Sequence, residues 1–342
     1  MDITYLLWLQ GIREALPPVV EQFFVVVSAI AVNNALILIP CILFWCLDKR
    51  AGQYLVFTFS WGSFANQFVK NTVCCNRPWI RSSAVHPSAK ALAEATGYSF
   101  PSGHTQAATS LFGGLGSFYH KRLKPLLGNL LFVLCWTFAL LVGFSRNFLG
   151  VHTPQDVLVG LLEGIVLVAL IPRLLDWIDE EDRRDLAVAF VSVLACAAYL
   201  AYVAFKPYPM TLDEAGNLLV DPLEMQIDCF KSAGVFLGAM VGWAAERHLV
   251  RFATNPRAGI ARNLLRLALG LAVVGALHVA PRPLLALGID MRWYEFVKNL
   301  LTVLAAAFVG PMVFSAVERR IWGKPQESET EVSPHRPEHL AK

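Results

Sequence analysis

The stretch YSFPSGHTQAATSLFGG, residues 98–114, decides how the chain is organised. Its first half is polar and rich in turn-forming residues, whereas its second half is small and apolar enough to begin a membrane helix. Free backbone N–H groups and the positive end of the helix dipole lie at such a helix start, and both favour an anion. The stretch therefore predicts an anion-binding site at the membrane boundary.

The composition places this stretch in a membrane protein. Of 342 residues, 56% are hydrophobic and only 16% are charged, whereas soluble domains have about 25% charged residues. The net charge of +3 is small, and the charges cluster between apolar runs, which argues against binding to nucleic acid. We predict an all-α, polytopic bundle of membrane helices, with nine apolar segments of spanning length at 22–47, 52–70, 102–119, 125–144, 154–176, 185–205, 228–249, 262–280 and 296–317.

Two terminal segments fall outside these spans. Residues 1–18 predict a short amphipathic helix, either lying at the membrane surface or packed on the bundle itself. Residues 321–342 are polar, rich in Pro and Glu, and typical of a disordered tail.

The basic residues predict the orientation of the chain. With nine spans, 18 of the 29 Lys and Arg residues fall on the side of the C-terminus. Because cytoplasmic loops are enriched in Lys and Arg, we expect a cytoplasmic C-terminus. The loop at 71–101 and the turn at 145–153 then face the extracytoplasmic side.

Polar groups gather at the extracytoplasmic ends of three spans. They belong to KNTVCCNRP (70–78), PSGH (101–104) and SRNFLGVHTPQD (145–156). Cations at a membrane boundary without matching acids favour an anion, and arginine binds phosphate oxygens in a bidentate way. We predict a phosphate site formed by Lys70, Arg77, Ser102, Gly103 and Arg146.

Two histidines supply the chemistry for cleaving a phosphate ester. One imidazole can attack phosphorus while the second protonates the leaving oxygen. His152 and Asp156 are four residues apart at a helix start, so the carboxylate can orient the ring. Taken alone, Asp156 is better explained by a helix start in which Thr153 is the cap and Pro154 the first residue.

These three motifs resemble the signature of the type 2 phosphatidic acid phosphatase (PAP2) superfamily: Lys-x6-Arg-Pro, Pro-Ser-Gly-His and Ser-Arg-x5-His. The resemblance covers roughly residues 22–205 and implies a six-helix catalytic core at 19–205, with about three further membrane helices in 206–320. It implies that His152 is the nucleophile, Asp156 orients it and His104 is the general acid and then base. The five residues of the phosphate site would bind the phosphoryl oxygens, with no metal or other cofactor.

The expected activity is metal-independent hydrolysis of a lipid phosphate or diphosphate at the outer membrane–water interface through a phosphohistidine. Substrates of the isoprenyl diphosphate, phosphatidic acid or sphingoid phosphate type fit this expectation. The nine-span count is similar to the glucose-6-phosphatase branch, so a small soluble ester is one alternative, and a non-catalytic lipid-phosphate binder or transporter is another. A vanadate-dependent haloperoxidase uses a similar site but is soluble.

Further expectations concern the location of the protein, its assembly and two acidic residues. The expected location is a bacterial plasma membrane, and a homo-oligomer and a disulfide among Cys74, Cys75 and Cys229 are left open. Glu94, in the extracytoplasmic loop, is better explained by a plain loop role than by a head-group contact. Glu163 shares the helix face of Asp156 one layer deeper, where it could support the site.

Overall fold

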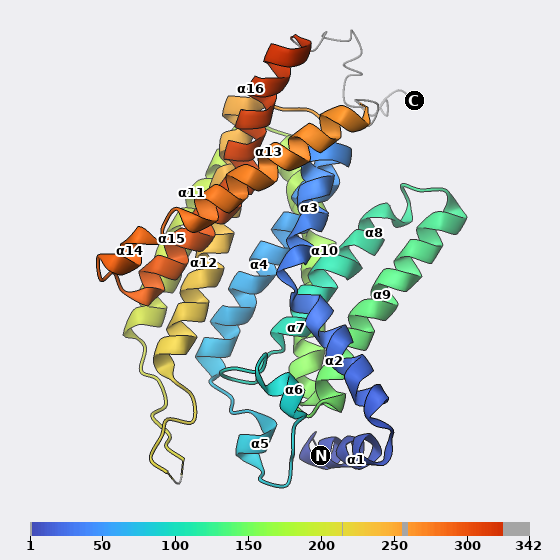
Figure 1. Cartoon of the computed structure of the whole chain (residues 1–342), viewed down its shortest axis with the longest axis vertical. Coiled ribbons are helices and arrows are strands. Elements are labelled where there is room, and N and C mark those ends of the chain that lie inside the picture. Colours follow the sequence, from blue (N-terminus) through green and yellow to red (C-terminus); the bar gives the residue numbers. More distant parts are fainter. Residues whose placement is uncertain (1, 214, 255–258, 324–342) are drawn as a thin grey trace, which may run out of the picture.

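The computed structural model describes residues 2–213, 215–254 and 259–323. It is an elongated bundle whose helices run mostly along its long axis (Figure 1). Apart from an isolated bridge between Leu212 and Leu218, the described residues contain no β-structure. The predicted all-α membrane bundle is confirmed. The tail predicted to be disordered lies, from residue 324 onward, outside the described residues.

The first part of the chain leads to a long central helix. Its elements are α1 (Asp2–Ala15), α2 (Pro18–Val32), η1 (Asn34–Ile37), α3 (Leu38–Ile42), η2 (Leu43–Leu47) and α4 (Lys49–Val73). A 50° bend separates the helical segments 18–32 and 35–47, so the first predicted span is a broken helix. Asp48 caps α4 by accepting a hydrogen bond from the N–H of Ala51 at 3.0 Å.

The middle of the chain packs around α4. It comprises α5 (Pro78–Arg81), α6 (Ala89–Leu92), α7 (Gly103–Ala108), η3 (Thr109–Gly113), α8 (Gly114–His120), α9 (Pro125–Phe148), α10 (Pro154–Asp179) and α11 (Arg184–Phe205). Both α9 and α10 begin at a proline, which suits the first turn of a helix. In Figure 1, α4 lies between α7–α9 on one side and α12 and α15 on the other.

The C-terminal part adds a second set of helices. It contains α12 (Pro222–Ala245), η4 (Glu246–Val250), α13 (Ile260–Val279), α14 (Pro283–Ala286), α15 (Met291–Leu304), η5 (Ala305–Val309) and α16 (Gly310–Trp322). Phe57 of α4 packs against Trp243 of α12 with ring centroids 4.9 Å apart. The two sets of helices therefore share one hydrophobic core.

Small residues let α12 and α15 approach closely. Gly234, Gly238 and Gly242 recur every four residues along α12, and a Cβ on Gly238 would lie 2.6 Å from the carbonyl O of Leu300. Spacing of small residues at every fourth position lets the backbones of membrane helices come into contact. This contact fixes the position of α12 in the bundle.

We expect Gly238→Leu to lower the free energy of unfolding by at least about 2 kcal/mol, because a backbone carbonyl cannot move aside as a side chain can. Thermal unfolding in detergent measures the effect. Gly275→Leu is the matched control, because a Cβ at Gly275 has no neighbouring atom within 4 Å. Equal unfolding temperatures for the two variants would contradict the packing argument.

The nine predicted spans all lie on helices within the described residues. Six helices are long and apolar enough to cross a membrane, and the bent pair at 18–47 makes a seventh. The remaining two, α4 and the run from α7 to α8, are more polar. On α4 the side chains of Gln53, Thr58 and Asn66 are buried. Polar side chains at membrane depth are tolerated when they face the interior of the bundle, so these helices are suited to carry a site.

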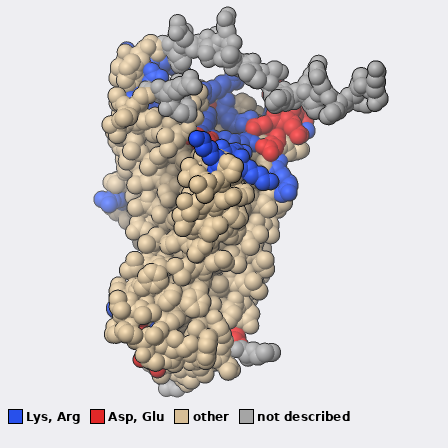
Figure 2. Space-filling model, turned by 90° about the vertical axis from the view of Figure 1, so that its right-hand side faces the viewer, with Lys and Arg blue, Asp and Glu red and all other residues tan. Residues whose placement is uncertain are grey.

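Charge is distributed unevenly along the bundle. On the face shown in Figure 2, Lys and Arg side chains gather at the upper end, where α16 ends in Figure 1. Ion pairs tie helices together at that end, for example Arg50 with Asp176 and Asp179, and Arg247 with Asp179 and Asp185. The N-terminus and the loop between α4 and α7 lie at the opposite end (Figure 1).

The N-terminal helix α1 lies across the lower end of the bundle (Figure 1). Leu6 and Leu9 are buried, and Arg13 donates to the carbonyl O of Phe148 at 3.1 Å. On the other face, Trp8 is 60% exposed. One face of α1 therefore packs on the bundle, which is one of the two predicted alternatives. The opposite face points away from the protein. All seven cysteines, which lie in the described residues, are free thiols.

Candidate active site

The turn between α9 and α10 holds His152. The backbone N–H groups of Val151 and His152 donate to the carbonyl O of Arg146 at 3.1 and 3.2 Å. Gly150 has a φ of +73°, a conformation that glycine adopts without strain. The turn is thereby closed onto the end of α9, which fixes the histidine relative to the arginine.

Asp156 lies in the first turn of α10 and is 2% exposed. Its Oδ2 accepts hydrogen bonds from the N–H of Thr153 at 2.7 Å and from Oγ of Ser99 at 2.5 Å. Thr153 in turn caps α10, so the helix-start interpretation of Asp156 is confirmed. The same Oδ2 lies 3.5 Å from Nδ1 of His152. One carboxylate therefore both begins a helix and faces the imidazole.

The contacts of His152 determine which ring nitrogen carries the proton. Arg77 lies with Nη1 2.9 Å from Nε2 of His152. A guanidinium can only donate, so Nε2 bears the lone pair and the proton is on Nδ1, facing Asp156. Burial, followed by the charges of Arg77 and Arg146, lowers the pKa of His152 well below its ordinary value. The ring is therefore neutral at pH 7 and presents a lone pair at Nε2 among cations.

Arg77 is held in place by backbone carbonyls. It donates to the carbonyl O atoms of Thr96 at 2.6 Å, Gly97 at 2.9 Å and Val151 at 3.0 Å, and it is 3% exposed. Burial lowers the pKa of Arg77 to about 9, which leaves it charged at neutral pH. A rigid positive charge therefore lies directly beside His152.

Arg146 is fully buried and only partly satisfied. Its Nη1 donates to Oγ of Ser28 and lies 3.9 Å from Oε2 of Glu94. Its Nε and Nη2 have no hydrogen-bond partner among the described residues. Burying an unpartnered donor costs free energy, and an anion bound beside Arg146 would recover it.

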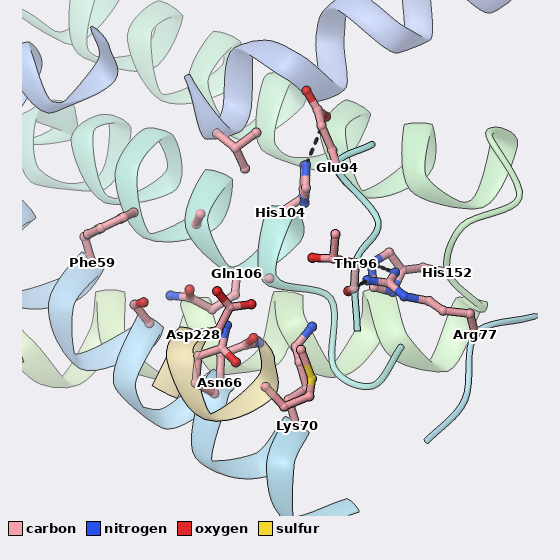
Figure 3. Close-up of a pocket in the computed structure, with 16 residues that line it drawn as sticks. Phe59, Asn66, Lys70, Arg77, Glu94, Thr96, His104, Gln106, His152 and Asp228 are labelled. Atoms are coloured by element: carbon pink, nitrogen blue, oxygen red, sulfur yellow. Dashed lines mark hydrogen bonds and ion pairs between the residues drawn. The ribbon is translucent and has the colours of Figure 1, made fainter. Parts of the chain in front are cut away.

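The other histidine, His104, stands in the first turn of α7. Its Nε2 lies 3.3 Å from Oε2 of Glu94, in the loop before α7. The hydrogen bond to His104 lowers the pKa of Glu94, which keeps this carboxylate ionised. Figure 3 shows the Glu94–His104 pair and the Arg77–His152 pair at separate places around one pocket.

That pocket is a cavity of about 240 Å³ at the ends of α4, α7 and α12, beside the turn before α10 (Figure 3). It is smaller than the ~300–1,000 Å³ of sites for drug-sized ligands, so it suits a head group. Five of the eight predicted site residues line it, namely Lys70, Arg77, Gly103, His104 and His152. The other three, Ser102, Arg146 and Asp156, are buried behind this wall.

Helix α7 begins at this cavity. Ser102 caps α7, because its Oγ accepts from the N–H of Thr105 at 3.4 Å. A Cβ on Gly160 of α10 would lie 2.5 Å from the carbonyl O of Ser102, and a Cβ on Gly103 would lie 3.4 Å from Oδ1 of Asn66. The first turn of α7 is therefore held between α4 and α10, and the Ser102 side chain is used as a cap.

Several polar residues of the cavity were missing from the predicted site, among them Asn66, Glu94 and Asp228. Glu94 lies ten residues before His104 without any recognisable spacing, and Asp228 lies on α12, far along the chain. Asn66 donates to Oε2 of Glu163 at 2.7 Å, so the expected support from Glu163 reaches the site through Asn66. Within the described residues, no three His, Cys, Asp or Glu side chains gather as metal ligands.

The fold and this site define a polytopic membrane protein with a buried, cation-lined pocket that contains two histidines. Residues 51–180 match the PAP2 superfamily, and residues 230–320 match the PAP2 superfamily phosphatase transmembrane extension. The chain belongs to the PAP2 superfamily. No solved structure was found to match it.

Curated relatives are similar over parts of the chain. Phosphatidylglycerophosphatase B of Bacillus subtilis is 35% identical over 98 residues, which are 28% of this chain and 47% of the relative. Sphingosine-1-phosphate phosphatase 1 of Rattus norvegicus is 27% identical over 136 residues, 40% of this chain and 30% of the relative. Its Mus musculus counterpart is 24% identical over 238 residues, which are 67% of this chain and 52% of the relative. The chain thus spans about half or less of the length of these relatives.

Proposed function

We propose that this protein hydrolyses the phosphate ester of a membrane lipid through a phosphohistidine intermediate. The observation that carries the proposal is the distance of 2.9 Å between Nη1 of Arg77 and Nε2 of His152, on the wall of the pocket. Membership of the PAP2 superfamily and the printed names of its curated relatives support lipid phosphatase activity.

The first chemical step forms the covalent intermediate. Nε2 of His152 attacks phosphorus, and the bond between phosphorus and the leaving oxygen breaks. His104, protonated in the complex with the anionic substrate and held at Nε2 by Glu94, gives the proton on Nδ1 to the leaving oxygen. Asp156 stabilises the positive charge that develops on His152. Lys70, Arg77 and Arg146 stabilise the negative charge on the phosphoryl oxygens.

The second step releases phosphate. His104, now neutral, accepts a proton from water as the water oxygen attacks phosphorus. The bond from phosphorus to His152 Nε2 breaks, which restores the lone pair facing Arg77. The cations supply the charge stabilisation in both steps, so we propose that the reaction proceeds without a metal.

The position of the pocket supports a lipid substrate at the outer interface. The cavity lies at helix ends, where a head group can enter while its tail stays in the bilayer. It lies toward the end of the bundle that holds the N-terminus, away from the basic end in Figure 2. Because basic ends face the cytoplasm, we propose an extracytoplasmic active site in a plasma membrane.

Phosphate release by the purified full-length protein in detergent tests this function. We expect turnover of at least one of phosphatidic acid, sphingosine 1-phosphate and undecaprenyl diphosphate, with the same rate after addition of EDTA. Glucose 6-phosphate is the soluble comparison. Turnover of glucose 6-phosphate alone would move the function to small esters, and binding of all lipids without phosphate release would make the protein a binder.

A further inference from the structure

Helix α12, which continues into the 230–320 match to the transmembrane extension, contributes directly to the active-site cavity. Met225 and Asp228 of α12 line it, although α12 lies outside the 51–180 match to the superfamily. Met225 is buried and packs on Gly97, whose carbonyl O binds Arg77 at 2.9 Å. Helix α12 is therefore seated on the loop that positions the catalytic cations.

The wall to which α12 contributes presents hydrogen-bond acceptors. The amide nitrogen of Asn66 donates to Glu163 at 2.7 Å, and that of Gln106 donates to Ser110 at 2.8 Å. These two hydrogen bonds fix the amide groups in place, and both amide oxygens remain available as acceptors for a ligand. The cavity also contains Gln67, whose buried Oε1 has no partner among the described residues.

Asp228 adds a carboxylate to these oxygens. Its Oδ1 accepts from Nζ of Lys231 at 3.1 Å, while Oδ2 has no hydrogen-bond partner within the described part of the chain. In Figure 3, Asp228 and Asn66 lie across the pocket from Arg77 and His152. The cavity therefore has a cationic wall for a phosphoryl group and an acceptor wall facing it.

We propose that this acceptor wall, with Asp228 as its only full charge, binds a hydroxyl or ammonium group on the leaving alcohol, close to the ester oxygen. The inference rests on the proposed phosphatase function and narrows its substrate to phosphate monoesters of polyol or amino-alcohol lipids. A leaving alcohol that carries only a hydrocarbon chain would leave the acceptors of this wall without hydrogen-bond donors. A second phosphate on the substrate is repelled by the carboxylate of Asp228.

Matched substrates with the full-length protein test the inference. Sphingosine 1-phosphate carries an ammonium and a hydroxyl near the ester, octadecyl phosphate has the same chain length without either, and farnesyl diphosphate has a second phosphate. For the unmodified protein, we expect kcat/KM for sphingosine 1-phosphate to exceed that for octadecyl phosphate by roughly 10- to 100-fold. We expect Asp228→Ala to remove most of this ratio, because it slows turnover of sphingosine 1-phosphate far more than turnover of octadecyl phosphate. The same variant should turn over farnesyl diphosphate faster than the unmodified protein does.

Glu224→Ala is the matched control, because Glu224 is an exposed carboxylate on the same helix, and it should keep the ratio. A thermal unfolding temperature of Asp228→Ala equal to that of the unmodified protein shows that this variant is folded. An equal loss on all three substrates, or an unaltered ratio, overturns the role of Asp228 while the phosphatase function stands. Absence of phosphate release by the unmodified protein from every substrate overturns the proposed function and this inference together.

Discussion

Replacing His152 by Ala is expected to reduce phosphate release on the order of 10⁴-fold or more, because removal of a covalent nucleophile leaves only binding and charge stabilisation. The contact of His152 supports this role, because its Nε2 lies 2.9 Å from Nη1 of Arg77 and therefore bears the lone pair that can attack phosphorus. Quenching the reaction of a ³²P-labelled lipid should trap labelled protein that is stable in alkali and labile in acid, as a phosphoramidate is. The His152→Ala variant should trap none.

His86 provides the comparison for this variant. It is an exposed histidine whose backbone N–H binds Gln10 at 2.8 Å, and it lies outside the cavity wall. His86→Ala should form the labelled intermediate at the normal rate. Equal turnover by His152→Ala and the unmodified protein would rule out His152 as the nucleophile.

A second large effect is expected for Arg146→Ala, which should lower kcat/KM by about 10²- to 10³-fold. Arg146 is fully buried, and its Nε and Nη2 donors have no partner within the described part of the chain. The kcat/KM of Arg146→Lys should lie between that of Arg146→Ala and that of the unmodified protein, because lysine keeps the charge but not the planar set of donors. Steady-state kinetics on a lipid monophosphate measure this order.

Ser28→Ala separates the catalytic from the structural role of Arg146. Ser28 is the hydroxyl to which Nη1 of Arg146 donates, so this variant removes the structural contact and leaves the guanidinium. We expect a loss below about tenfold, because one hydrogen-bond partner is removed while the charge and the other donors of Arg146 stay in place. A loss in Ser28→Ala as large as that in Arg146→Ala would show that the arginine acts only through packing.

Much of this architecture could be predicted from the sequence, because long apolar runs and fixed motif spacings are local signals. The nine spans fall on helices, and five of the eight predicted site residues line one cavity. Asp156 shows why single residues are harder to interpret. Its capping role follows from four adjacent residues, whereas its contact with His152 depends on how the turn folds back.

The residues that were missed depend on packing between distant segments. Glu94 reaches His104 because the loop at 82–100 returns over the start of α7, and no spacing encodes that path. Asp228 reaches the cavity because the glycines of α12 set its depth against α15. Nothing in the local sequence around Asp228 distinguishes it from an ordinary polar residue at the end of a span.

The turn that closes onto Arg146 has a consequence for how the protein responds to different bilayers. Both Val151 and His152 bind the carbonyl O of Arg146 through their N–H groups, so the proposed nucleophile and the proposed phosphate-binding cation move as one unit with α9. Membrane helices tilt to match the thickness of the hydrocarbon layer. Such tilting carries the histidine and the arginine together, so a thicker or thinner membrane should change how readily a lipid reaches the pocket and leave the reacting geometry intact.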